Sequence, residues 1–308
     1  MEYLPDVFSA DDAECEVVNA FSFEFPHLYV AISARSEEEG LSAGGLLRID
    51  ASGPDPTYEL LHEFDSGLLD YHAQSSNVHY ALESGSYLHV FSNGDHEFFQ
   101  FPAPEFLNHV TPMAPGRVAV YGEGGTIYRF EGGLFTPIPA GSPAALNAMH
   151  FPRPDFGYAC GRRGTLLESD GNRFVPSDIG GAEPLQAVHV RESGGLMLGS
   201  AGGVGIVVDA GEVLRLEGTG SDLLSVTEFG GQELWGDDDF GVYTRRGSEL
   251  VPRFGTGGAF NMNPIGNVLT INAGYEIYAT NGADWIRIGI NPDVDDLVER
   301  LALDFTPL

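Results

Sequence analysis

The chain has 308 residues, of which 45 are acidic and 15 basic, so its formal net charge is −30 at pH 7. A hydrophobic content of 43% and an aromatic content of 11% exclude a disordered chain, and no stretch approaches the roughly 18 apolar residues that a membrane span needs. The two cysteines, Cys15 and Cys160, are too few for a disulfide framework, have no metal-ligand spacing, and are expected to be buried.

A short apolar strand followed by a glycine-centred turn recurs seven times along the chain, and a second apolar or aromatic strand follows each turn. The segments are Leu47–Gly53, Leu88–Gly94, Ile127–Gly132, Leu166–Gly171, Ile206–Gly211, Val242–Gly247 and Ile277–Gly282. Their turn glycines lie 35 to 41 residues apart. Glycine is expected there because tight hairpin turns need a positive φ, which glycine adopts without steric cost. The repeat therefore predicts seven β-hairpins.

Two further strands are predicted before each hairpin. A second glycine precedes the turn glycine by six to nine residues, at Gly85, Gly125, Gly164, Gly203, Gly241 and Gly274. The first strand of each set opens on an apolar residue, at Leu68, Leu107, Leu146, Leu185, Leu223 and Phe260. Four antiparallel strands in about 38 residues, with no helical stripe, predict an all-β fold, a seven-bladed β-propeller. Neighbouring blades must stack, because one blade cannot bury both of its faces.

We expect a single propeller domain over residues 1–308. The predicted blades span 17–64, 65–102, 103–140, 141–178, 179–218, 219–255 and 256–290. The first blade is the least regular. The tail, residues 291–308, contains an Asp-rich stretch and then Leu297–Leu303. Two alternatives remain for it: a strand that closes the first blade, or a short helix capped by the preceding Asp or Asn residues.

Two segments of the chain, Ala159–Phe174 and Val118–Phe135, resemble the repeat of a known group of propellers. Their order of apolar strand, glycine hairpin, strand and acidic turn resembles the sialidase-like (BNR or Asp-box) propellers, which include the photosystem II assembly-factor propellers. The resemblance covers about residues 65 to 290 and implies a fold, not an activity. Ser169-Asp170-Gly171 with Phe174 approximates a shortened Asp-box. The three arginines, the Tyr/Glu pair and the acid Asp of sialidases have no assignable counterparts.

Three histidines occupy equivalent positions in the predicted innermost strands. His72, His150 and His189 each lie four residues after the strand opening, where two other repeats carry Thr111 and Thr227. Imidazole is a common zinc ligand, so the three are candidate metal ligands. No carboxylate or cysteine shares the pattern, and hydrogen bonding to water or backbone is the favoured interpretation.

Charged turns supply the candidate binding residues. Asp237, Asp238 and Asp239 form one acidic turn, which lacks the ligand spacing of an EF-hand calcium loop. Glu37, Glu38 and Glu39 form another, in the first blade, and are expected to be solvated. Arg162 and Arg163 form a basic pair, for which internal pairing with carboxylates is favoured over an acidic ligand.

No catalytic motif is recognisable, so we predict a non-enzymatic, cytoplasmic, protein-binding propeller without a cofactor. The charge disfavours nucleic acid and anionic membranes as partners and favours a basic protein. The sharpest hypothesis is an inhibitor or immunity-type protein, monomeric when free, that neutralises a basic toxin or nuclease. One alternative is a glycosidase or lyase of the sialidase-like type, which would place paired carboxylates around a pocket. A second alternative is an assembly or scaffold factor.

Overall fold

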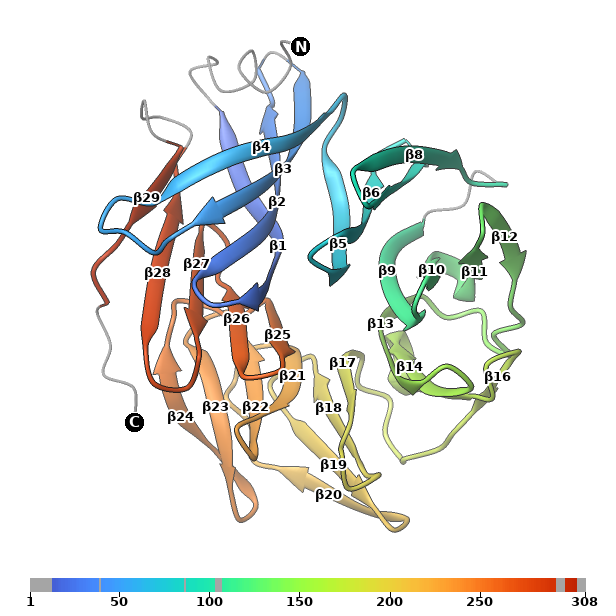
Figure 1. The fold of residues 1–308 in the computed structure, drawn as a ribbon. Coiled ribbons are helices and arrows are strands. Elements are labelled where there is room, and N and C mark those ends of the chain that lie inside the picture. The colour runs from blue at the N-terminus through green and yellow to red at the C-terminus, as the bar shows by residue number, and fades with distance from the viewer. Residues whose placement is uncertain (1–12, 39, 86, 103–106, 292–296, 304–308) are drawn as a thin grey trace. The chain divides into compact units, whose positions relative to one another are not determined.

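The computed structural model describes residues 13–38, 40–85, 87–102, 107–291 and 297–303. These residues form seven antiparallel sheets, six with four strands and one with five, and in each sheet the strands pair in chain order (Figure 1). The fold is therefore the predicted seven-bladed β-propeller. Two short 3-10 turns interrupt the strands, at Glu123–Gly125 and Arg162–Gly164. Among the described residues no helix has the length and apolarity to cross a membrane.

The contacts divide the chain into two compact units, and the first combines the described residues of Met1–Gln100 and Asn261–Thr306. It holds three sheets. Their strands are β1 (Glu14–Glu24), β2 (His27–Ser36), β3 (Leu41–Asp50) and β4 (Thr57–Phe64); β5 (Leu68–Ser75), β6 (Val78–Glu83), β7 (Tyr87–Ser92) and β8 (Asp95–Gln100); and β25 (Asn261–Ile265), β26 (Val268–Asn272), β27 (Glu276–Thr280), β28 (Trp285–Ile290) and β29 (Val298–Arg300).

The second unit lies within Phe101–Phe260 and holds four sheets. Their strands are β9 (Leu107–Ala114), β10 (Arg117–Gly122), β11 (Ile127–Glu131) and β12 (Leu134–Pro137); β13 (Leu146–Arg153), β14 (Phe156–Gly161), β15 (Thr165–Ser169) and β16 (Phe174–Pro176); β17 (Leu185–Val190), β18 (Leu196–Ser200), β19 (Gly205–Asp209) and β20 (Glu212–Leu216); and β21 (Leu223–Phe229), β22 (Gln232–Asp237), β23 (Gly241–Arg246) and β24 (Glu249–Gly255).

Burial follows strand position within a sheet. The second strands, such as β6 and β18, are buried on both faces, and their sequences are correspondingly apolar. The fourth strands, such as β8 and β20, are mostly exposed. Successive sheets share their cores: Met149, Ala159 and Leu167 pack with Met113 and Tyr121 of the preceding sheet. Within each unit, each sheet thus buries the face that it could not bury alone.

The last and first sheets of the chain share a core in the first unit. Ile277 and Ile288 pack with Val30 and Ile49 in one buried cluster. The amide of Asn272 on β26 donates to the carbonyl of Val17 on β1 at 2.7 Å. Figure 1 shows β1 beside these C-terminal strands. The backbone N–H of Val17 also donates to the carbonyl of Gly274 at 2.8 Å. The first and last sheets of the described chain are therefore joined by packing and by these hydrogen bonds, and not through a shared strand.

The predicted turn glycines are confirmed in the backbone. All six of the second-glycine positions have a positive φ, from +67° at Gly164 to +134° at Gly241. Six of the seven hairpin glycines also do, from Gly94 to Gly282. Gly53 is the exception, because β3 and β4 of the first sheet are joined by the longer segment 51–56.

A position can require glycine because its φ is positive or because a neighbouring segment leaves no space for a Cβ. The adjacent residues Gly202 and Gly203 allow these two requirements to be compared. Both have a positive φ, near +80°, but a Cβ on Gly202 would meet open space. A Cβ on Gly203 would lie 2.7 Å from the backbone nitrogen of Gly220 and the backbone oxygen of Ser221. We expect Gly202→Ala to cost about 1 kcal/mol of unfolding free energy and Gly203→Ala about 3 kcal/mol. Urea unfolding of the two variants measures this, and equal costs would contradict a steric role for the loop Thr219–Asp222.

The tail differs from both alternatives considered above. Val298–Arg300 is a strand, not a helix, and pairs with β28 of the last sheet instead of joining the first. Val298 is buried with Ile288 and Ile290, so burial of its apolar side chain holds the tail strand against β28. Arg300 reaches the first sheet through its side chain, which donates to the carbonyl of Gly53 at 2.6 Å. The acidic residues Asp293, Asp295 and Asp296 lie outside the described residues.

Candidate functional site

The acidic turn at Asp237–Asp239 joins β22 and β23, and its three carboxylates have different environments. Asp237 is buried, and its Oδ1 accepts hydrogen bonds from the backbone nitrogens of Phe240 and Gly241 at 2.9 and 2.7 Å. Burial and this carboxylate together raise the pKa of Tyr243. Asp237 therefore shapes the turn, and its predicted role in binding stays a prediction. Asp238 and Asp239 are exposed, as that prediction requires.

The other predicted charged turns lie at strand ends. Glu37 and Glu38 are exposed in the turn between β2 and β3, and Glu39 lies outside the described residues. Arg162 and Arg163 are exposed in the 3-10 turn between β14 and β15. A nitrogen of Arg162 lies 3.4 Å from Oε1 of Glu123 in the neighbouring sheet, which is the internal pairing that the sequence favoured.

The structure brings together two of the three predicted histidines. The rings of His150 and His189 stack with centroids 4.5 Å apart, and Nδ1 of His150 accepts the backbone N–H of Val190 at 2.8 Å. Burial lowers the pKa of His150 to about 3 and that of His189 to about 4, so both rings are neutral at pH 7. His72 belongs to the other unit, where it packs edge-on against Phe21 at 4.7 Å.

A charge network that the sequence did not predict surrounds His189. Arg191, just after β17, lies 2.9 Å from Glu233 on β22 and 3.9 Å from Glu228 on β21. Arg245 on β23 lies 2.7 Å from the other oxygen of Glu233. The side chains of Arg191 and Glu233 are only about 15% exposed. Because each arginine already has a carboxylate partner, the network compensates its own positive charge, and it links β17, β21, β22 and β23 of two neighbouring sheets.

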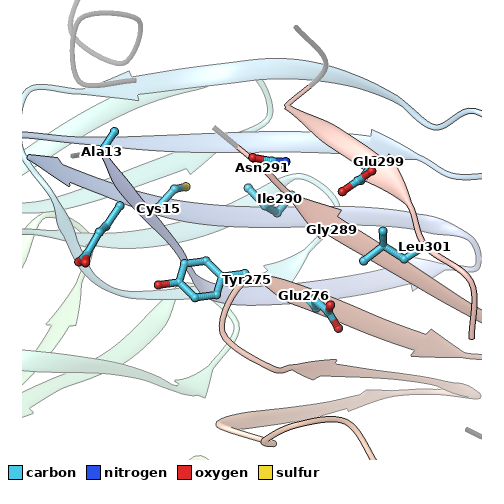
Figure 2. A pocket seen from close by; sticks show the side chains of 10 residues that line it. Ala13, Cys15, Tyr275, Glu276, Gly289, Ile290, Asn291, Glu299 and Leu301 are labelled. Carbon is cyan, nitrogen blue, oxygen red and sulfur yellow. The ribbon is translucent and has the colours of Figure 1, made fainter. Parts of the chain in front are cut away.

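An acidic cleft lies in the first unit, where the first and last sheets meet (Figure 2). Its volume is about 330 Å³, and its lining includes the carboxylates Glu14, Glu276 and Glu299. The strand register explains how two of these carboxylates come together. Gly289 on β28 pairs with Glu276 on β27 on one side and with Glu299 on β29 on the other. Since residues that pair across strands share a face, two carboxylates flank a position without a side chain.

The carboxylates of the cleft differ in whether an arginine neutralises their charge. Glu276 lies 2.6 Å from Arg287 and accepts a hydrogen bond from the hydroxyl of Tyr278. Glu14 lies 2.9 Å from Arg35. Glu299 is exposed and has no arginine or histidine within ion-pairing distance among the described residues. Leu301 and Glu299 cover Gly289, because a Cβ there would lie 3.1 Å from Leu301 Cδ1 and 3.2 Å from Glu299 Cγ. The cleft therefore suits a cationic group that approaches the exposed carboxylate of Glu299 from the solvent side.

Cys15 also lines this cleft but carries no nucleophilic chemistry. The residue is 1% exposed, and burial raises the pKa of its thiol to about 12. At neutral pH it is a protonated, weakly polar side chain, as the sequence predicted for a buried cysteine.

A second cluster that the sequence did not predict contains His62, His89 and His96 in the first unit. Burial lowers the pKa of His62 to about 4. The proximity of two of these histidines could have been predicted from the sequence. The two-residue turn Asn93-Gly94 fixes the register of a hairpin that places His89 and His96 on one face. His62 comes from another sheet, and no local pattern links it to them.

The comparisons with known proteins define the fold alone. No protein-family model and no curated protein matches the chain. Among solved structures, the computationally designed Ika8 protein matches with a TM-score of 0.66 and 16% identity, over 95% of this chain and 98% of that one. The WD40 β-propeller domain of Doa1 matches with a TM-score of 0.64 and 11% identity, over 84% and 90%.

A third similar structure is YCF48 bound to the D1 peptide. It matches with a TM-score of 0.60 and 11% identity, over 86% of this chain and 93% of that one. These similarities, at 11–16% identity, place the chain among β-propellers. They agree with the resemblance to photosystem II assembly-factor propellers at the level of the fold, while no family model supports the sialidase-like group by sequence.

Proposed function

We propose that the chain is a non-enzymatic protein-binding propeller that captures a basic partner. The observation that carries this is the pairing of its arginines. Ten of them lie within 4.0 Å of a carboxylate oxygen among the described residues, at Arg35, Arg48, Arg117, Arg153, Arg162, Arg173, Arg191, Arg215, Arg245 and Arg287. Positive charge is thus neutralised internally, and the surplus carboxylates act on the solvent and on a partner.

The acidic cleft is the proposed contact for a cationic side chain of that partner. Glu299 supplies an exposed carboxylate at the edge of the cleft, and no arginine or histidine of the described residues pairs with it. A guanidinium or ammonium group fits a space of this size, and a charge-assisted hydrogen bond to a carboxylate is stronger than a neutral one. That YCF48 was solved with a bound peptide supports peptide capture by a propeller of this kind.

The finer proposal is a cytoplasmic, monomeric inhibitor or immunity-type protein. Carboxylates arranged on a rigid surface would imitate the anionic substrate of a basic toxin or nuclease. The same charge would repel nucleic acid and anionic membranes. The glycosidase alternative gains no support from the Arg191 network, because both of its arginines are already paired with Glu233.

Three double variants locate the contact, and each removes two negative charges. They are Glu14→Gln with Glu299→Gln in the cleft, Glu37→Gln with Glu38→Gln, and Asp238→Asn with Asp239→Asn. Because the three have the same net charge, differences among them report position and not overall charge. We expect the cleft variant to weaken partner binding about tenfold or more and the other two to weaken it less.

The partner is first captured from the source cell at low salt and at about 0.5 M salt, because screening weakens Coulombic capture. Its identity comes from mass spectrometry, and its affinity for each variant from biolayer interferometry. Acidic partners, or binding unchanged by salt and by all three variants, would overturn the proposal. If the basic partner binds but does not arrest growth when expressed alone, only the inhibitor role fails.

A further inference from the structure

Three imidazoles meet between the first two sheets of the chain, away from the acidic cleft. His62 lies on β4, His89 on β7 and His96 on β8. Their nitrogen atoms that could bind a metal all lie within 4.8 Å of one another. The ring centroids of His62 and His96 are 4.2 Å apart, and those of His89 and His96 are 5.2 Å apart.

The hairpin β7–β8 and the end of β4 hold these rings in place. Phe91 pairs with His96 across the hairpin, and their rings stack at 4.5 Å. Phe64, two residues after His62 on β4, packs edge-on against both His62 and His89, at 4.7 and 5.0 Å. The cluster therefore has aromatic walls, with His89 buried at its base and His96 exposed at its mouth.

Glu83 orients the buried histidine. Its Oε2 lies 2.9 Å from Nε2 of His89, and the carboxylate is itself buried, with Oε1 accepting the backbone N–H of Ser66 at 3.0 Å. A carboxylate there fixes the tautomer with hydrogen on Nε2. The lone pair of His89 is then on Nδ1, which accepts a hydrogen bond from Nε2 of His96 at 3.0 Å, a bond that a metal ion between the two nitrogens would replace. A carboxylate on the far nitrogen of a ligating histidine is the usual outer shell of a zinc site.

We propose that His62, His89 and His96 bind one divalent zinc-type ion, with Glu83 as the positioning residue behind His89. Nitrogen ligands about 2.0–2.1 Å from a tetrahedral ion lie roughly 3.3 Å from one another, so the present arrangement needs only small side-chain rotations. The three imidazoles leave a fourth position beside exposed His96. That position is open to water or to a ligand atom of another protein.

The donor set selects the class of ion. Three imidazoles suit zinc and its neighbours, whereas calcium and magnesium prefer oxygen ligands. This distinction matters in a chain of net charge −30, which attracts every divalent cation to its surface. A specific site must therefore retain zinc in the presence of excess calcium.

The test uses the untagged full chain, stripped with EDTA and titrated with zinc chloride in 0.15 M salt and 5 mM calcium chloride. Isothermal titration calorimetry is expected to show one tight equivalent of zinc, and cobalt substitution to give the visible spectrum of a tetrahedral site. Thermal unfolding is expected to shift upward with zinc, because binding to the folded state alone stabilises it.

The variant His96→Ala is the main probe, because the side chain is exposed and its loss is expected to leave the fold intact. We expect it to weaken zinc binding at least tenfold, and Glu83→Gln to weaken it tenfold to a hundredfold. The matched control is His27→Ala, a half-exposed histidine on β2 outside the cluster. No tight equivalent of zinc, or equal binding by wild type and His96→Ala, would overturn the proposal. Partner capture is measured without added metal, so each proposal can fail alone.

Discussion

Acidification from pH 7 to about 4.5 is expected to lower the free energy of unfolding by several kcal/mol. Burial lowers the pKa of His72 to about 4, of His150 to about 3 and of His189 to about 4. In the unfolded chain a histidine has a pKa near 6.5. Below that pH the unfolded state binds more protons than the folded state, so stability falls as the pH falls.

Protonation of these histidines lowers the free energy of unfolding at acidic pH, whereas the loss of negative charge at acidic pH raises it. The stability that these histidines contribute is complete above about pH 6.5 and is lost as the pH falls toward 4. At about 1.4 kcal/mol per unit over the two units from pH 6.5 to 4.5, the three together lose on the order of 8 kcal/mol. Protonation of carboxylates relieves repulsion in a chain of net charge −30, but that repulsion is screened and spread over the surface.

Urea unfolding at pH values from 7.5 to 4.5 measures which of the two effects, histidine protonation or relief of carboxylate repulsion, dominates the free energy of unfolding. Burial lowers the pKa of His62 to about 4 as well, which makes four similar contributions. We expect His189→Gln to flatten the pH dependence by about a quarter, because it removes one of the four. His27→Gln, on a half-exposed residue, is expected to leave the slope unchanged. Stability that rises steadily toward pH 4.5 would show that charge repulsion dominates and would contradict the prediction.

Substitution of Trp235 by alanine is expected to cost about 4 kcal/mol of unfolding free energy. Trp235 on β22 is 0% exposed and is the largest fully buried side chain among the described residues. It packs with Met197, Val207 and Leu250 in a cluster that joins two sheets of the second unit. The alanine leaves a cavity that the short strands on both sides cannot collapse to fill.

Two further tryptophan variants separate packing from hydrogen bonding. The indole nitrogen of Trp235 has no hydrogen-bond partner among the described residues, so Trp235→Phe is expected to cost only about 1–2 kcal/mol. Trp285 on β28 is partly exposed, and Trp285→Ala is expected to cost less than Trp235→Ala. Guanidinium unfolding followed by circular dichroism measures all three. A larger loss for Trp285→Ala would refute the central position of Trp235.

The repetitive part of the fold was predictable because each blade repeats the same local chemistry. Glycines at fixed spacing require a positive φ, and the structure places them there, with Leu68, Leu107, Leu146, Leu185 and Leu223 each opening a first strand. The prediction failed where no repeat guides it. The longer segment after Asp50 removes the need for a left-handed Gly53, and the position of Val298 depends on the core it enters.

The candidate sites were less predictable, because they depend on residues from different sheets. Asp237 and Asp238 are adjacent in sequence, yet one is buried by backbone hydrogen bonds and the other is exposed. The acidic cleft requires Glu276, Gly289 and Glu299 to align across three strands. His62 joins His89 only because two sheets pack together. Such registers depend on tertiary packing, which a single sequence does not display.

The shared core of the first and last sheets also bears on synthesis of the protein by the ribosome. Val30 and Ile49 emerge early, but their partners Ile277, Ile288 and Val298 are translated more than 200 residues later. At 5–20 residues per second, the apolar face of the first sheet waits for roughly ten seconds or more before it is covered. During that interval the nascent chain exposes an apolar, aggregation-prone surface. Chaperone protection is therefore expected to matter most for its N-terminal sheet.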